Sequence, residues 1–330
     1  MAAYNAERFV DEAIKSILKQ SFSDWQLIVI NDGSTDRTSS IVQSYSALDE
    51  RIQLINQMNS GSAGAARNAA LKCVQGRYCQ MLDSDDLLSE DFLDAQYDIS
   101  LKTNPDIIVP NLVFFDKDTT NVIRKWNGNN GNYETINGEK GFYLSLDWTI
   151  HGFFTVRTKL LTEIKYESDL INGDEFTTRK LLYNASKIAF SKCHYFYRLN
   201  SFSTTRDNKN QVKMFQCLTT DYNLYKYALT NKMPVYLKKT CAKKLIHAFR
   251  YYQNIYKEKN KEWSLEDRKY VRNMMIDVYS RISIIEMIKL SPFFSLFLCL
   301  TGKKYPLFEL YIVLKIKMKK IFGSYLKVIS

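Results

Sequence analysis

The 330-residue sequence lacks the patterns that mark several classes of protein. Its six cysteines form no CxxC pair and show no metal-ligand spacing, which predicts reduced, mostly buried thiols in a cytosolic protein. No internal repeat or low-complexity tract is visible. The first residues contain neither a basic n-region nor an apolar h-region, so we expect no signal peptide and a cytoplasmic location.

Long apolar runs are also missing. Residues 291–300 are apolar, but this run is too short to span a bilayer. Residues 311–321 mix apolar side chains with lysines, which suits peripheral contact with an anionic membrane at the inner face of the cell membrane. Packing of a cationic helix explains this run equally well, and the sequence leaves both interpretations open.

The charge is concentrated in one part of the chain. Overall the sequence is 45% hydrophobic and 25% charged with a net charge of +11, as expected for a globular protein of about two domains. Residues 1–210 carry a net charge of −4, and residues 211–330 carry +15. This contrast predicts a domain boundary near residue 210 and a basic, helical C-terminal region. Its partner would be an anionic lipid, an acidic substrate or nucleic acid, unless it is simply a solvated helical surface.

The first 116 residues alternate between predicted strands and helices. Apolar residues recur at helical spacing near residues 7–20, 41–48, 65–74 and 90–102. Short apolar or alternating runs predict strands at 26–30, 51–56, 78–82 and 106–115, with Pro110 indicating an edge or a bulge in the last of them. This alternation predicts an α/β fold with a mostly parallel sheet.

An acidic cluster, Asp83-Ser84-Asp85-Asp86, directly follows the predicted strand at 78–82. Ligands of open α/β sheets bind at the carboxyl ends of the strands. Closely spaced carboxylates repel one another, and a hard divalent cation that also binds phosphate oxygens would relieve this repulsion. A solvated turn before a helix is the simpler interpretation of the cluster on its own.

Four motifs in order resemble the family 2 glycosyltransferases, which are inverting enzymes of the GT-A fold found in bacterial surface and capsular polysaccharide synthesis. The motifs span residues 3–7, 29–36, 64–68 and 82–86. The resemblance is strong over about residues 1–116 and weak over 140–206. It implies a GT-A nucleotide-sugar-binding and catalytic domain over residues 1–210, followed by the helical region 211–330.

The resemblance implies nucleotide contacts for a set of residues near the strand ends: Ala3, Tyr4, Asn5, Glu7, Asp32, Arg67, Asp83 and Ser84. Asp32 would accept a hydrogen bond from the uracil N–H, and Tyr4 would stack on the base. Arg67 would contact the base or the diphosphate, for which a guanidinium is better shaped than an ammonium. The simpler interpretations are an ordinary turn residue for Asp32 and a surface salt bridge for Arg67. For Tyr4, Asn5 and Glu7 they are the usual polarity of a loop and an acid at a helix N-terminus.

The same resemblance assigns a metal ligand and a catalytic base. Asp85 would bind Mg²⁺ or Mn²⁺, which would bridge the two phosphates of the donor and stabilise the departing UDP. Asp174 would deprotonate the acceptor hydroxyl. The family usually shows Glu-Asp at this position, whereas this chain has Gly173-Asp174-Glu175, which leaves Glu175 as the alternative base. An ordinary acidic helix N-terminus would also produce this pattern.

Three further residues are candidates for contacts with the acceptor or the diphosphate. Arg198 ends the run Tyr195-Phe196-Tyr197-Arg198, and Ser203 follows it, as in the family pattern. His151, one of only three histidines, lies where acceptor contacts would fall. Aromatic packing, a surface arginine and a structural histidine are the alternatives.

One strand that the resemblance implies has no residues in this sequence to form it. In the resembling family an apolar strand of about five residues precedes the loop that here begins at Met1. This strand would lie in the middle of the sheet, between residues 26–30 and 78–82. Its absence would leave buried backbone groups unpaired, at about 1–3 kcal/mol each. We therefore expect Met1 to be an internal methionine of a longer reading frame, or this form to be damaged.

Together these features predict an inverting, metal-assisted glycosyltransferase. It would move a sugar from a UDP-sugar to a saccharide or polyprenol-linked acceptor, and no nucleic-acid partner is expected. A nucleotidyltransferase would need a Gly-rich, Lys-bearing first loop, whereas this chain has Ala2-Ala3-Tyr4-Asn5. A non-catalytic basic module that binds membrane or nucleic acid would not require Asp32, Arg67, Asp85 and Asp174 to converge.

Overall fold

The computed structural model describes residues 1–170, 172–199 and 212–282. Contacts divide the chain into two units, Met1–Asn208 and Lys209–Ser330. Ser203 and the apolar runs 291–300 and 311–321 lie outside the described residues. None of the helices in the described part of the chain has the length and apolar character needed to cross a membrane.

The first unit begins with a small parallel sheet whose strands run in the order β1-β2-β3. Its strands are β1 (Ala2–Ala3), β2 (Leu27–Asp32) and β3 (Ile52–Gln57), and the connecting helices are α1 (Val10–Leu18), α2 (Thr38–Ser46) and α3 (Ala63–Ala70). All six residues of β2 are buried, as expected for a parallel strand with helices on both faces. This half of the unit follows the predicted alternation of strands and helices.

The second sheet is mixed, which the sequence does not reveal. Its strands run in the order β4-β8-β6-β9-β5, with β7 beside β6. They are β4 (Tyr78–Gln80), β5 (Leu87–Leu88), β6 (Ile107–Phe115), β7 (Val122–Trp126), β8 (Thr155–Arg157) and β9 (Ile188–Arg198). Among the described strands of this sheet, β6 and β9 pair in parallel and the other pairs are antiparallel. The prediction of a mostly parallel sheet therefore holds for β1–β3 and not for this sheet.

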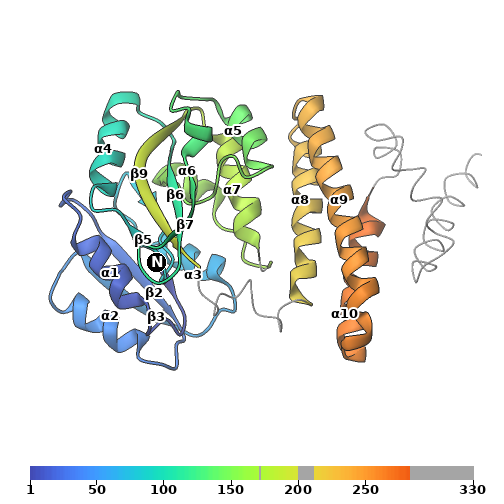
Figure 1. Cartoon of the computed structure of the whole chain (residues 1–330), viewed down its shortest axis with the longest axis horizontal. Helices are drawn as coiled ribbons and strands as arrows, with labels where there is room; N and C mark the ends of the chain where they lie inside the picture. Colours follow the sequence, from blue (N-terminus) through green and yellow to red (C-terminus); the bar gives the residue numbers. More distant parts are fainter. Residues whose placement is uncertain (171, 200–211, 283–330) are drawn as a thin grey trace, which may run out of the picture. The chain divides into compact units, whose positions relative to one another are not determined.

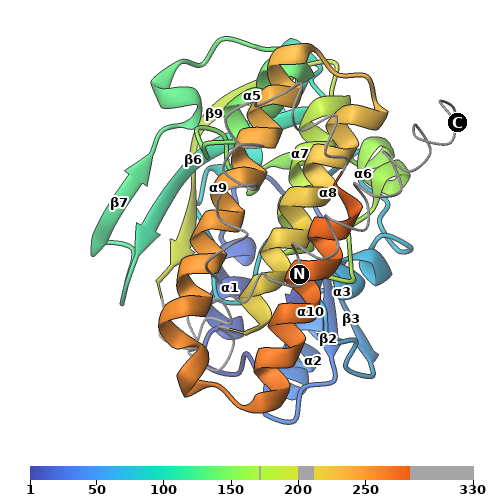
Figure 2. The ribbon, with the colours of Figure 1, turned by 90° about the vertical axis from the view of Figure 1, so that its right-hand side faces the viewer.

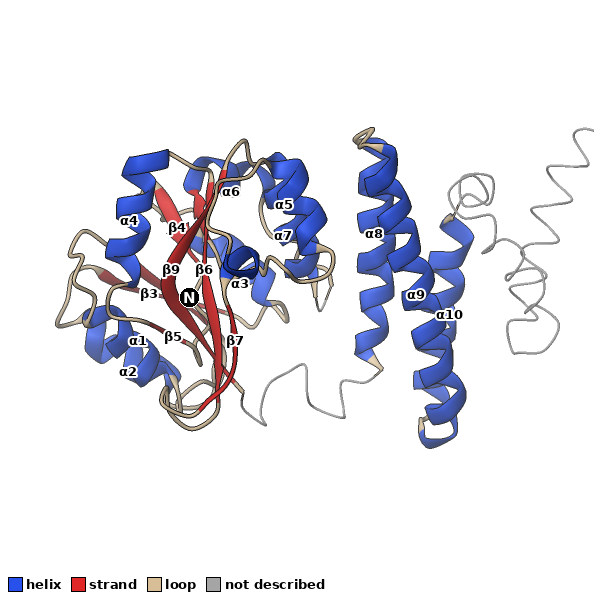
Figure 3. Ribbon diagram, turned by 45° about the horizontal axis from the view of Figure 1, so that its top comes forward, coloured by secondary structure: helices blue, strands red, loops and turns tan. Residues whose placement is uncertain are grey.

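The helices of the first unit cover the second sheet on two sides. Helix α4 (Phe92–Thr103) packs against β9, and α5 (Gly138–Ser145) and α7 (Gly173–Asn184) pack against each other on the other side (Figure 1). The short helix α6 (Thr158–Ile164) follows β8 and contacts α7. Figure 3 shows α4 and the α5–α7 pair flanking the strands β6 and β9. This arrangement brings the first turn of α7 toward the loop after β4.

Pro110 lies at a bulge, which is one of the two positions that its missing N–H predicts. The parallel pairing of β6 with β9 shifts register between Val109 and Asn111. Because proline donates no hydrogen bond, the shift lets the ladder continue on both sides of it. The bulge also turns the Pro110 carbonyl toward the side chain of His151, at 2.9 Å from its Nε2.

A short strand occupies the position beside β2 where the sequence provides no five-residue strand. Ala2 and Ala3 form β1 and pair in parallel with Ile30 and Asn31. The Met1 nitrogen adds a hydrogen bond to the Ile28 carbonyl at 2.7 Å. Among the described residues β2 does not pair with β4, and β1 supplies two residues where the resemblance implies a strand of about five.

The second unit is helical over its described residues, as its composition predicts. It contains α8 (Gln216–Thr230), α9 (Val235–Lys259) and α10 (Leu265–Arg281). Helices α8 and α9 pack side by side (Figure 2). The buried face of α9 carries apolar residues at helical spacing: Leu237, Cys241, Leu245, Ile246, Phe249 and Tyr252.

Candidate functional site

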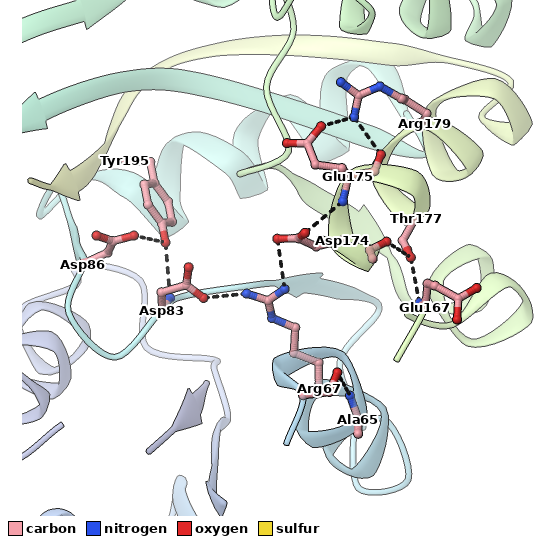
Figure 4. Close-up of polar contacts among 12 residues, drawn as sticks. Ala65, Arg67, Asp83, Asp86, Glu167, Asp174, Glu175, Thr177, Arg179 and Tyr195 are labelled. Atoms are coloured by element: carbon pink, nitrogen blue, oxygen red, sulfur yellow. Dashed lines mark hydrogen bonds and ion pairs between the residues drawn. The ribbon is translucent and has the colours of Figure 1, made fainter. Parts of the chain in front are cut away.

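Arg67 lies between two carboxylates that come from distant parts of the chain (Figure 4). Its Nη2 is 2.7 Å from Oδ1 of Asp83, and its Nη1 is 3.7 Å from Oδ2 of Asp174. The guanidinium side chain is only 11% exposed. Burial alone would lower the pKa of Arg67, but the charges of Asp83 and Asp174 outweigh it and raise this pKa above its ordinary value. The structure therefore joins the predicted acidic loop, the predicted helix arginine and the candidate base.

Two glycines allow the helices that carry these residues to approach the same backbone segment. A Cβ atom on Gly64 of α3 would lie 2.4 Å from the Glu167 carbonyl oxygen, and so would a Cβ on Gly173 of α7. The side chain of Asn68 fixes the same segment through two hydrogen bonds with the Tyr166 backbone, at 2.7 and 2.8 Å. Segment 166–167 is thus clamped between the N-terminal turns of α3 and α7.

The buried Tyr195 holds the acidic loop, residues 83–86, in place through two hydrogen bonds. The backbone N–H of Asp83 donates to the Tyr195 hydroxyl at 3.2 Å, and this hydroxyl donates to Oδ2 of Asp86 at 2.9 Å. Figure 4 shows Tyr195 reaching from β9 to both aspartates. Burial, reinforced by the charges of Asp83 and Asp85, raises the pKa of the Asp86 carboxyl well above its usual value. Asp86 therefore supports the loop from inside the protein, while Asp83 and Asp85 are partly exposed.

Arg198 holds the other side of the same loop. Its side chain donates from Nε to the Asp85 carbonyl oxygen at 2.8 Å and from Nη2 to the carboxylate of Glu12 on α1. The guanidinium also lies over the rings of Phe9 and Phe115. Because Arg198 is only 6% exposed, it braces the loop in this structure, and its contact with the diphosphate stays a prediction.

The predicted metal site consists of carboxylates alone in this structure. No group of three or more His, Cys, Asp or Glu side chains within the described residues is arranged to hold a metal ion. Mg²⁺ does not require such a group, since one or two carboxylates suffice when substrate phosphates supply the other ligands. Asp85, with Asp83 two residues away, fits that mode, since both carboxylates are partly exposed while Asp86 is buried.

The two candidate bases have different surroundings. The Asp174 side chain is 52% exposed and faces Arg67. The Glu175 side chain is 26% exposed and forms an ion pair with Arg179 one turn later on α7. Arg179 is itself buried and also donates to the Ser145 carbonyl, which ties α7 to α5. The geometry therefore favours Asp174 as the group that can reach a substrate.

Asp32 lies at the end of β2 and already accepts several hydrogen bonds. Its Oδ1 accepts from Nε2 of Gln57 at 2.5 Å and from the backbone of Ser60 at 3.0 Å, and its Oδ2 accepts from the Ser60 hydroxyl. The carboxylate is 6% exposed. It thus fixes the loop after β3, and its predicted bond to a uracil N–H would add to these contacts.

The loop after β1 carries the remaining predicted nucleotide residues. Tyr4 is 53% exposed, and Asn5 adopts a positive φ of 48°. The Asn5 side chain accepts from the Thr35 backbone at 2.9 Å, and the Glu7 carboxylate accepts from Arg37. Asn5 and Glu7 therefore hold the loops after β1 and β2 together. The predicted nucleotide contacts of these residues, of the buried Ala3 and of the partly exposed Ser84 remain predictions.

His151 is a core residue in this structure. It is 1% exposed, its Nδ1 accepts from the Phe153 backbone at 3.2 Å, and its Nε2 lies 2.9 Å from the Pro110 carbonyl. Nε2 therefore carries the proton of the neutral ring. Burial lowers the pKa of His151 to about 4. These contacts favour the structural alternative over the predicted contact with an acceptor.

Sequence reasoning missed some residues that shape the site. Tyr195 belongs to a run in which only aromatic packing was expected, yet its hydroxyl bonds the acidic loop. Asn68 belongs to the motif at residues 64–68, but its pairing with Tyr166 had no sequence signal, because it joins residues 98 positions apart. Glu12 resembles an ordinary acid in the first turn of a helix, so its link to Arg198 was equally hidden.

Comparisons with known proteins give a consistent result. The family model described as Glycosyl transferase family 2 matches residues 1–164. Glycosyltransferase GlyG of Streptococcus pneumoniae is 26% identical over 217 residues, which is 62% of this chain and 70% of GlyG. An Escherichia coli enzyme, WfgD, described as a UDP-Glc:alpha-D-GlcNAc-diphosphoundecaprenol beta-1,3-glucosyltransferase, is 40% identical over 104 residues. That alignment spans 32% of this chain and 40% of WfgD.

Solved structures show the same fold. The crystal structure of S. aureus TarS 1-349 in complex with UDP-GlcNAc superposes with a TM-score of 0.67 at 20% sequence identity. The match covers 88% of this chain and 82% of the TarS chain. The parallel sheet and the mixed sheet of the first unit thus form a GT-A-like α/β fold, and the second unit is helical over its described residues, which confirms the predicted fold class.

Proposed function

Because this chain belongs to glycosyl transferase family 2 through residues 1–164, we propose that it transfers a sugar from a UDP-sugar to a saccharide acceptor with inversion. The chain is a glycosyltransferase, and the acceptor we propose is a saccharide or a polyprenol-linked saccharide of a bacterial surface polysaccharide. The observation that carries the proposal is Arg67, which lies between Asp83 of the acidic loop and Asp174 of α7.

We assign the donor diphosphate to the space beside Arg67 and the acidic loop. Arg67 keeps its positive charge at every physiological pH and presents a planar fork suited to phosphate oxygens. Mg²⁺ or Mn²⁺ on Asp85, with Asp83 nearby, would neutralise charge on the departing UDP. Asp32, Tyr4 and the loop after β1 would hold the nucleoside, at the strand ends where such sheets bind nucleotides. UDP as the nucleotide is supported by the names of TarS in its UDP-GlcNAc complex and of WfgD.

We assign the base to Asp174, because its carboxylate is half-exposed and faces Nη1 of Arg67, whereas Asp83 faces Nη2. In the transfer step the acceptor hydroxyl oxygen forms a bond to the anomeric carbon. The bond from that carbon to the β-phosphate oxygen breaks, the hydroxyl proton goes to Asp174, and UDP leaves with the electron pair. The transition state has oxocarbenium character, as in glycoside hydrolysis, and attack from the face opposite the leaving group inverts the configuration.

A screen of UDP-sugars for metal-dependent release of UDP tests this function. We expect one or a few UDP-sugars to give UDP in the presence of Mg²⁺ or Mn²⁺, and EDTA to suppress the release. Adding a saccharide acceptor should accelerate UDP release and yield a product with inverted anomeric configuration by NMR. A protein that binds no UDP-sugar and releases no UDP with any of them would contradict the proposal. Release of pyrophosphate from a nucleoside triphosphate and a sugar phosphate would indicate a nucleotidyltransferase instead.

A further inference from the structure

A continuous row of aromatic rings leads from the acidic loop to the surface of the mixed sheet. We call its five members the aromatic strip: Phe114, Trp126, Trp148, Phe153 and Tyr197. The ring centroids of successive members lie between 4.9 and 6.3 Å apart, which is contact distance for aromatic pairs. Four of the rings are partly exposed, and Trp148 is 40% exposed.

Three members of the strip lie on one face of the sheet. Phe114 of β6 is directly opposite Tyr197 of β9, and Trp126 of β7 is opposite Leu112, two residues before Phe114. Because side chains two residues apart share a face, these three rings and Tyr195 point the same way. Figure 2 shows β7, β6 and β9 side by side, with β7 outermost. The strip therefore crosses three neighbouring strands on a single surface.

The inner end of the strip touches the proposed transfer site. The Phe153 ring lies 4.7 Å from the Tyr195 ring, whose hydroxyl bonds Asp83 and Asp86. One residue earlier, a Cβ on Gly152 would lie 2.7 Å from the Thr178 hydroxyl, one turn of α7 beyond Asp174. The strip thus begins beside both the acidic loop and the helix that carries the proposed base.

The outer end of the strip carries a tryptophan in a strained conformation. Trp148 has a φ of +67°, a region that bulky side chains rarely occupy. Strained residues of this kind persist where the surrounding structure requires them, and they cluster at binding and catalytic sites. Here the conformation holds the Trp148 indole 6.3 Å from that of Trp126. Burial does not explain this placement, because Trp148 remains 40% exposed.

We propose that the aromatic strip binds the sugar rings of the acceptor saccharide. This inference rests on the proposed glycosyl transfer and locates the acceptor within it. The C–H faces of pyranose rings stack on aromatic rings, while indole N–H and phenol O–H groups can donate to sugar hydroxyls. A strip of several rings suits an acceptor of several sugar units. The reactive sugar at the end of that acceptor would lie next to Phe153, the inner end of the strip, and its hydroxyl would reach Asp174. The composition favours a saccharide over an acyl chain, because all five members are flat rings and two are indoles with a polar N–H.

The experiment measures binding of soluble oligosaccharides without turnover. Saturation-transfer NMR with chitotetraose, laminaritetraose and maltotetraose, in the presence of UDP, should show the strongest transfer to sugar C–H protons of at least one of them. Trp148→Ala and Trp126→Ala should each weaken that binding tenfold or more. Trp148→Phe, which restores a ring, should recover most of it. UDP affinity should stay within twofold of the wild-type value in every variant, which also verifies folding.

Tyr97→Ala serves as the matched control. Tyr97 is 44% exposed on α4, outside the strip, and its substitution should leave oligosaccharide binding unchanged. The inference is overturned if the wild-type protein shows no saturation transfer to any of the three oligosaccharides. It is also overturned if Trp148→Ala weakens UDP and oligosaccharide binding equally, or weakens only the binding of vesicles that contain polyprenyl phosphate. Failure of the proposed function would differ, since UDP would then fail to bind in the wild-type protein as well.

Discussion

Arg67 connects three predictions that the sequence could make only separately. The arginine, the acidic loop and Asp174 each have a local explanation, as a salt bridge, a turn and a helix N-terminus. Their convergence is not local, because α3, the loop after β4 and α7 are brought together by the fold. A lysine could not maintain both contacts with the same geometry, since it lacks the two-pronged guanidinium.

The base assignment can be tested by comparing neighbouring residues. Asp174→Asn should lower the transfer rate by about 10²–10⁴-fold, the usual contribution of a general base, with little change in UDP affinity. Glu175→Gln should retain most of the rate. It should instead reduce stability by about 1–3 kcal/mol, because the buried Arg179 loses its charged partner. Steady-state kinetics, UDP titration calorimetry and urea unfolding make the comparison. The reverse pattern, with Glu175→Gln inactive and Asp174→Asn active, would exchange the two roles.

Asp85 is the residue to test for the metal. Asp85→Asn removes a charge directed at the proposed ion, so transfer should fall by at least 100-fold even at saturating Mn²⁺. The fold should survive, because the inner support of the loop comes from Asp86, Tyr195 and Arg198. Transfer rates measured across a Mn²⁺ titration, with circular dichroism as the folding control, check this. Near-normal turnover of the variant would remove Asp85 from the metal site.

The lowered pKa of His151 predicts that the stability of the folded protein depends on pH. Its pKa is about 4 in the folded protein, whereas an unfolded histidine titrates near 6.5. The unfolded chain therefore binds this proton first, so the stabilisation is complete above pH 6.5 and is lost progressively as the pH falls toward 4. The difference corresponds to about 3 kcal/mol. His151→Gln should flatten this part of the stability curve, measured as the urea midpoint between pH 7 and 4.5. An unchanged slope in the variant would show that other groups cause the acid sensitivity.

At the scale of elements, local signals predicted local structure. The helices α1 to α4 and the strands β2, β3, β4 and β6 follow from apolar periodicity, whereas the two-residue strands β1 and β5 were not predicted. The bulge at Pro110 is one of the two positions that its missing N–H predicts. The mixed sheet could not be predicted in this way, because β8 and β9 join strands that are distant in sequence. Antiparallel insertion of β8 between β4 and β6 depends on these long-range pairings and on no motif.

In the candidate site, too, local features could be predicted from the sequence and long-range contacts could not. Each acidic or basic residue was recognisable by its position at a strand end or helix start. The supporting contacts were not, because Tyr195 reaches the acidic loop across more than a hundred residues. His151 shows the opposite case: its position in the sequence made it a candidate for an acceptor contact, whereas in the fold it is 1% exposed, and the contact stays a prediction.

The clamp between α3 and α7 gives a prediction about elements. Gly64→Ala would place a methyl group 2.4 Å from the Glu167 carbonyl oxygen, so α3 must move away from segment 166–167. We expect a loss of about 1–3 kcal/mol of stability, typical of overpacking. Transfer should fall as well, because Arg67 moves with α3. Gly76→Ala is the control, since its nearest contact would be a milder 3.2 Å. Equal activity and equal urea midpoints for the two variants would contradict the clamp.

At the scale of the whole molecule, a large part of the positive charge on the described residues of the second unit lies on one helix. Helix α9 contains seven Lys and Arg residues and a single acidic residue. Its exposed side carries basic residues at helical spacing, including Lys239, Lys243 and Arg250, together with the exposed Tyr236 and Tyr251. Cations flanked by aromatic side chains suit the headgroup region of an anionic membrane. A solvated helical surface would carry the same residues without binding anything.

A liposome experiment separates these two interpretations of α9. We predict that the full chain sediments with vesicles containing phosphatidylglycerol, and that binding weakens as salt rises from 50 to 500 mM because screening shortens the reach of the charges. Reversing Lys239, Lys243 and Arg250 to Glu should weaken binding tenfold or more, at about 1 kcal/mol for each basic residue near the surface. Reversing the exposed Lys19, Lys72 and Lys140 of the first unit to Glu changes the net charge by the same amount, and this control should bind almost as well as the wild-type protein. If both triple variants lose binding equally, the effect follows from net charge and not from α9. If the wild-type protein binds neutral and anionic vesicles alike, the positive charge of the second unit has no role in membrane docking.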